Sequence, residues 1–139
     1  MVKVTRFGVS LGTELLKKFD SLIKKRGYKS RSEAVRDLIR ERLVSEEWIE
    51  EEKETVGILG LVFSHETREL TEILTKLQHK YLDLIISSTH IHLDQHNCLE
   101  VIVLRGKSFL IKKISDELIS TRRVKHGKLL MTTTGKDID

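Results

Sequence analysis

The sequence predicts an α+β fold in two parts, a strand with two helices followed by the order βαββαβ. The hydrophobic period switches between two and about 3.6 residues along the 139-residue chain. The charge also divides: residues 1–44 carry 12 Lys and Arg against 5 Asp and Glu, a net +7, whereas residues 45–139 carry a net −3. A basic head joined to a mildly acidic body indicates that the head binds a polyanion and the body has another task.

The first part begins with a strand, because residues 4–11 alternate between two faces. Apolar side chains occupy one face, and the other face carries Arg6, Gly8 and Ser10. A helix follows and ends at Gly27, a residue suited to the position after a helix. A second helix is predicted from about Arg31, because Ser30 and Glu33 form a capping box.

One strand and two helices cannot close a core alone, because the strand has two unpaired edges and each helix buries one stripe. Two copies that pair through the strand would form an antiparallel ribbon over four helices. We therefore expect residues 1–45 to form an obligate dimer. The acidic residues 46–55 are expected to be a linker that can be helical.

Residues 56–139 are expected to form the second domain. Its predicted elements are a strand at 56–64, a helix over 70–77, strands at 84–93 and 98–105, a helix over 110–118 and a strand at 129–133. This order is that of the ferredoxin-like arrangement.

The composition bounds the location and the chemistry. No stretch approaches the roughly 18 apolar residues of a membrane span, and no apolar signal segment begins the chain. We expect a cytoplasmic protein without a membrane partner. Cys98 is the one cysteine, so a reduced thiol is expected.

A two-stranded ribbon fits the DNA major groove, where Arg6 can bond to guanine, Ser10 can contact several bases and Gly8 allows close approach. The start of the second helix offers free backbone N–H groups beside Lys29, Arg31 and Ser32, which suits a DNA phosphate. The alternative is an ordinary dimerisation ribbon with a solvated basic rim.

The most specific chemistry lies between His90 and Glu100. Alternation places His90 and His92 on one strand face, and a loop over residues 93–97 sets His92 opposite Cys98 and His90 opposite Glu100. Two imidazoles, one thiolate and a fourth donor can hold Zn(II), Cu(II) or Ni(II). We expect Ile91 and Leu93 to take the opposite face, toward the helices.

The remaining histidines are expected to have structural roles. His65 caps a helix or is solvated, His96 is solvated at the loop tip, and His126 shapes a turn before Gly127. The pattern alone makes His79 an exposed residue at a helix end, where its charge favours the macrodipole.

The sequence resembles the nickel-responsive transcriptional regulators of the NikR family over nearly its whole length. The matching stretches are residues 6–11, 26–37 (RGYKSRSEAVRD), 78–79, 90–100 (HIHLDQHNCLE) and 125–128 (KHGK). The resemblance implies a ribbon-helix-helix dimer fused to an ACT-like nickel-sensing domain, assembled as a homotetramer that is a dimer of dimers.

The resemblance also implies roles for individual residues. One Ni(II) per subunit would be held in a planar site by His90, His92 and Cys98 of one subunit and His79 of a neighbour. Gln78 and Glu100 would orient these ligands, and Glu33 with Asp37 would form a secondary cation site. The protein with bound Ni(II) would bind double-stranded operator DNA and repress nickel-uptake genes.

The chain departs from the family at Gly8, where some members carry a hydroxyl residue, and after His79, where Lys80-Tyr81-Leu82 is poor in histidine. Two other functions are alternatives to the non-enzymatic regulator. A metalloenzyme would use an open metal position to activate water, and an amino-acid-responsive regulator would carry a structural zinc.

Overall fold

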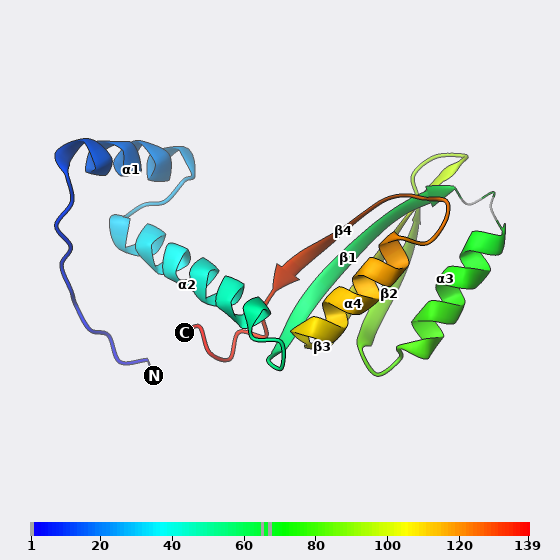
Figure 1. Ribbon diagram of the computed structural model, residues 1–139. Helices are drawn as coiled ribbons and strands as arrows, with labels where there is room; N and C mark the ends of the chain where they lie inside the picture. The colour runs from blue at the N-terminus through cyan, green and yellow to red at the C-terminus, as the bar shows by residue number, and fades with distance from the viewer. Residues whose placement is uncertain (1, 65, 67) are drawn as a thin grey trace. The chain divides into compact units, whose positions relative to one another are not determined.

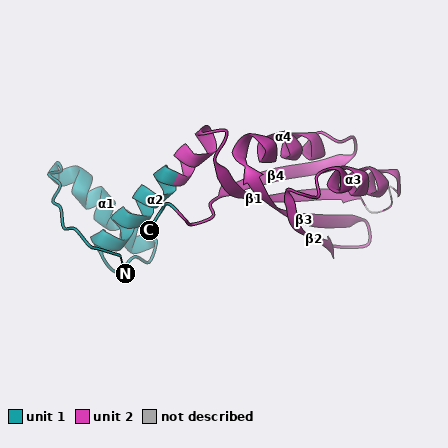
Figure 2. Cartoon of the chain, turned by 90° about the horizontal axis from the view of Figure 1, so that it is seen from below, with its two compact units in different colours: residues 1–43, 137–139 teal, residues 44–136 magenta. Residues whose placement is uncertain are grey.

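The computed structural model describes residues 2–64, 66 and 68–139. The chain divides into two compact units, Met1–Leu43 with Asp137–Asp139, and Val44–Lys136 (Figure 2). The domain limits predicted at residues 45 and 55 stay a prediction. No helix within the described ranges is long and apolar enough to span a membrane.

Two helices form most of the first unit, α1 (Thr13–Lys25) and the N-terminal part of α2 (Arg31–Ile49). The first helix ends as predicted, with Gly27 at φ 82° and the Tyr28 N–H bonded to the Ile23 carbonyl at 3.0 Å. Ser30 caps the second helix, since its Oγ accepts the Glu33 N–H at 3.2 Å.

The strand predicted over residues 4–11 is not formed in the single chain, and residues 2–12 have no regular secondary structure. A strand needs a hydrogen-bonded neighbour, and this one was expected to pair with a second copy. The apolar face is therefore open: Val4, Phe7 and Val9 are 83%, 69% and 66% exposed.

The second unit has the predicted order βαββαβ (Figure 1). Its elements are β1 (Glu54–Ser64), α3 (Arg68–Lys80), β2 (Ile85–His92), β3 (Asn97–Lys107), α4 (Ser108–Ile119) and β4 (Val124–Thr132). The sheet order is β2-β3-β1-β4, with every neighbouring pair antiparallel. The last strand begins five residues before its predicted start, because Lys125, His126 and Lys128 hide the apolar alternation there.

Helices α3 and α4 cover one face of this sheet (Figure 2). The core between the layers consists of side chains that are at most 1% exposed, among them Leu59, Leu61, Phe63, Leu70, Leu74, Ile102, Leu104, Ile111, Ile114 and Leu118. Gly127 permits close approach of α4, since a Cβ there would lie 2.6 Å from Ile119. The sheet face that carries Cys98 and Glu100 is the covered one.

The end of α2 packs in the second unit. Trp48 is 2% exposed, and its indole Nε1 donates to the Thr132 carbonyl at 2.8 Å. Lys112 donates to the Trp48 carbonyl at 3.1 Å. Residues 46–49 of the predicted linker are therefore helical and anchored to β4 and α4.

Candidate metal centre

The hairpin of β2 and β3 has the predicted register. His90 pairs with Glu100, and His92 pairs with Cys98. Because paired residues in an antiparallel ladder point to the same face, these four side chains share one side of the sheet. The His90 ring lies at a steep angle to the Phe63 ring of β1, with the ring centroids 5.8 Å apart. Phe63 is fully buried, so this side of the sheet is the helix-covered one.

Within the described part of the chain, one group has the geometry of a metal site: His90, His92 and Cys98, with ligand atoms within 4.8 Å of one another. The Cys98 Sγ lies 3.6 Å from the His92 Nδ1. An ion with bonds of about 2.0–2.3 Å needs donors roughly 3–4 Å apart, so small side-chain adjustments suffice to hold nickel or zinc. Three donors leave at least one coordination position open.

The prediction that Ile91 and Leu93 face the helices is wrong. These residues lie on the opposite face and are 40% and 52% exposed. Apolar residues alternate with the ligands in this stretch, and polarity alone assigns the apolar ones to the core. In β3 the polar residues are the more buried ones: Cys98 and Glu100 are buried and alternate with half-buried Leu99 and Val101.

Burial governs the chemistry of the thiol. Cys98 is fully buried, whereas both imidazoles are exposed. Desolvation raises the pKa of the Cys98 thiol, and the charges of Asp94 and Glu100 raise it further. The thiol is therefore protonated near neutral pH, and metal binding must release its proton.

Glu100 is the polar centre of the covered face. It is 9% exposed, and its Oε1 accepts bonds from Gln78 Nε2 of α3 at 2.9 Å and from Ser88 Oγ of β2 at 2.8 Å. These bonds tie α3 to the strand that carries the histidines. Sequence reasoning missed Ser88, although its place two residues before His90 puts it on the same face.

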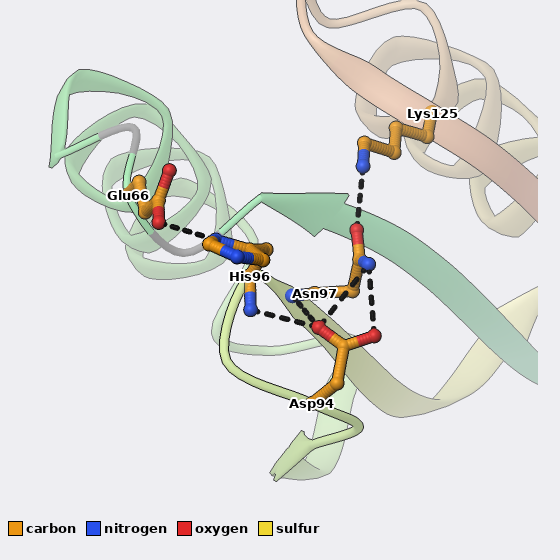
Figure 3. Close-up of polar contacts among 5 residues, drawn as sticks. All are labelled: Glu66, Asp94, His96, Asn97 and Lys125. Carbon is orange, nitrogen blue, oxygen red and sulfur yellow. Dashed lines mark hydrogen bonds and ion pairs between the residues drawn. The ribbon is translucent and has the colours of Figure 1, made fainter.

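The loop that joins the two ligand strands is closed by Asp94 (Figure 3). Its carboxylate accepts the backbone N–H groups of His96 at 2.7 Å and Asn97 at 2.8 Å, and the Asn97 amide at 3.0 Å. These bonds lower the pKa of Asp94 to about 2. Lys125 of β4 donates to the Asn97 Oδ1, which fixes the residue before Cys98.

The other histidines that the structure describes do not join the three ligands within one chain. His96 pairs with Glu66 (Figure 3), and His126 lies within β4 rather than at a turn. His79 is exposed near the end of α3. His65 lies outside the described residues.

The predicted DNA contacts lie in the first unit. Arg6, Gly8 and Ser10 are exposed in the irregular N-terminal segment, and Lys29, Arg31 and Ser32 surround the start of α2. The Arg31 guanidinium forms two bonds to Asp20 of α1, at 2.9 and 2.8 Å. Arg31 therefore holds the two helices together in addition to its predicted contact with DNA phosphate. The sequence did not reveal this contact.

The two carboxylates of the predicted secondary cation site already have partners. The Tyr28 hydroxyl donates to Asp37 at 2.7 Å, and the Lys29 N–H donates to Glu33 at 3.4 Å. A cation at these carboxylates would share them with the two donors.

Comparison with known families agrees with this arrangement. Residues 56–132 match the NikR C-terminal nickel-binding domain. Residues 5–46 match the ribbon-helix-helix proteins of the copG family. The second match implies DNA binding and dimerisation for the first part of the chain.

Three relatives share the curated name "Putative nickel-responsive regulator". The protein of Caldanaerobacter subterraneus subsp. tengcongensis is 56% identical over 97% of this chain and 88% of its own. Those of Geobacter sulfurreducens and Thermococcus onnurineus are 54% and 51% identical, each over 99% of both chains. The chain therefore belongs to the NikR family of nickel-responsive DNA-binding regulators, and it is a transcription regulator rather than an enzyme.

Proposed function

We propose that the chain binds one Ni(II) per subunit, binds operator DNA in that state and represses nickel-uptake genes. The observation that carries this proposal is the group of His90, His92 and Cys98, whose donors lie within 4.8 Å of one another. Two imidazoles and a soft thiolate suit nickel, copper or zinc, and a planar arrangement of four donors selects against zinc.

His79 of a neighbouring subunit completes the site in this proposal. Two features support it: the imidazoles are exposed, so the open position faces outward, and His79 is exposed on α3 outside its own chain's group. Gln78 and Glu100 act by orienting the helix and the ligand strands. A homotetramer, a dimer of dimers, brings the two chains together.

The first unit reads the operator as a dimer. The side chains that we assign to base edges are those of Arg6 and Ser10, with Gly8 between them, and Lys29, Arg31 and Ser32 meet phosphate. Since the ligands come from two chains, nickel binding orders α3 of the chain that supplies His79. This ordering shifts the populations of the conformations that residues 45–55 adopt. A cation bound by Glu33 and Asp37 would further stabilise α2 in the first unit.

An absorption titration of the reduced protein with Ni(II), read alongside an operator shift assay, tests the proposal. We expect a thiolate-to-nickel charge-transfer band that saturates at one equivalent per chain, and operator binding that rises with it. Cys98→Ala should lose both signals. The proposal is overturned if the wild-type protein binds the operator equally well without nickel. It is also overturned if the thiolate band appears and Zn(II) competes for the site, but operator binding does not change.

A further inference from the structure

We infer that Tyr81 and Glu117 form a clamp that positions His79, so that both are positioning residues for nickel binding. The Tyr81 hydroxyl, just after α3, donates to the Glu117 Oε2 of α4 at 2.6 Å. This inference rests on the proposed role of His79 as a ligand.

The clamp matters because α3 is held by few apolar contacts. Its buried side chains are Leu70 and Leu74, both before its last six residues, whereas α4 buries the apolar Ile111, Ile114 and Leu118 along its length. The half of α3 that carries His79 therefore depends on polar contacts for its orientation.

Two polar anchors flank His79 in sequence. Gln78 bonds to Glu100 of the sheet at 2.9 Å, and Tyr81 bonds to Glu117. Since the two anchors engage different layers, they fix both the height of this helix end above the sheet and its distance from α4. His79 lies between them and remains exposed.

Neighbouring groups support the clamp from outside. The Lys80 ammonium lies 3.8 Å from the Glu117 Oε1 and 5.1 Å from the centre of the Tyr81 ring. The Tyr81 carbonyl accepts the N–H groups of Leu84 and Ile85, which closes the turn into β2. Lys80 and Tyr81, which stand where the chain is poor in histidine, thus hold the end of α3 in position.

The test compares full-length variants loaded with Ni(II) alone. Tyr81→Phe removes only the hydroxyl, and Glu117→Ala removes its acceptor, so each should weaken nickel binding about tenfold. The double variant should bind no more weakly than Glu117→Ala alone, because that variant already removes the acceptor of the Tyr81 hydroxyl and the carboxylate that pairs with Lys80. Each variant should also hold part of its nickel in a paramagnetic form, because a displaced His79 no longer completes the planar, diamagnetic site.

Tyr28→Phe is the matched control, since it removes a tyrosine-to-carboxylate bond of 2.7 Å in the first unit and should leave nickel binding unchanged. His79→Ala distinguishes a failure of the clamp from a failure of the proposed ligand role of His79. If His79→Ala weakens binding while Tyr81→Phe and Glu117→Ala bind like the wild type, the clamp is wrong. If His79→Ala itself keeps the wild-type affinity and magnetism, the proposed ligand set is wrong.

Discussion

At the scale of single residues, the site depends on bonds that hold the ligands rather than on the ligands alone. Asp94 accepts bonds from three nitrogen donors, and these bonds close the loop between His92 and Cys98. Glu100 gathers a donor from α3 and another from β2. Both carboxylates keep the two ligand strands in the one register that brings the donors together.

Asp94→Ala should lower the thermal stability of the protein, by an amount that depends on pH. The pKa of Asp94 falls from 3.8 to about 2 in the native loop, so its ionised form stabilises the fold above pH 3.8, and this contribution is lost as the pH falls through about 2. Thermal melts of both proteins measure the effect. The Tm gap between them should be constant at neutral pH and narrow below pH 4; a gap that widens with acid would contradict the assignment.

Arg31→Lys tests whether the two hydrogen bonds to Asp20 matter for the DNA-reading head. Lysine keeps the charge but cannot form the paired bonds of a guanidinium, so we expect lower thermal stability and weaker operator binding. Asp20→Asn should produce the same two losses. If Arg31 served phosphate alone, Asp20→Asn would leave operator binding intact, as an operator shift assay would reveal.

Residue contacts could be predicted from the sequence where the two-residue alternation of a strand alone determines the pairing. The pairing of His92 with Cys98 followed from loop length and alternation. The covered face could not be predicted in the same way, because Ile91 and Leu93 are more apolar than the ligands beside them. Asp20 and Ser88 were missed because their partners, Arg31 and Glu100, are distant in the sequence.

At the scale of elements, the segment with residues 4–11 differs most from its prediction. The helices α1 and α2 end and begin where their capping residues indicate, because such signals act within one chain. The strand depends on a second copy, and its exposed Val4, Phe7 and Val9 are the surface that pairing would cover. Local signals therefore predict helix limits better than they predict a strand shared between chains.

Val9→Pro should abolish dimerisation through this segment, because proline removes a ladder donor and disfavours a paired strand. Sedimentation measures the assembly, and we expect operator binding to be lost with it. Nickel binding by His90, His92 and Cys98 provides the internal control, since these ligands lie in the second unit. A Val9→Pro protein that still binds the operator would show that the segment is not a ribbon.

At the scale of the whole molecule, the nickel site that we propose needs ligands that one chain does not bring together. The described chain unites His90, His92 and Cys98, and His79 lies apart from them on α3. The sequence pattern alone gave His79 no role as a ligand, and the family resemblance supplied it. A site divided between chains leaves no signature in the spacing of one sequence.

The most direct test of this account mixes two variants that each lack one ligand, His79→Ala and Cys98→Ala, and follows nickel-dependent operator binding after the chains exchange. Neither variant alone can form a complete site. In a mixed pair, the chain that retains Cys98 can receive His79 from its partner, so one complete site forms beside one broken site. We expect nickel-dependent operator binding to return in the mixture; a mixture that binds the operator no better than either variant alone would contradict a site shared between chains.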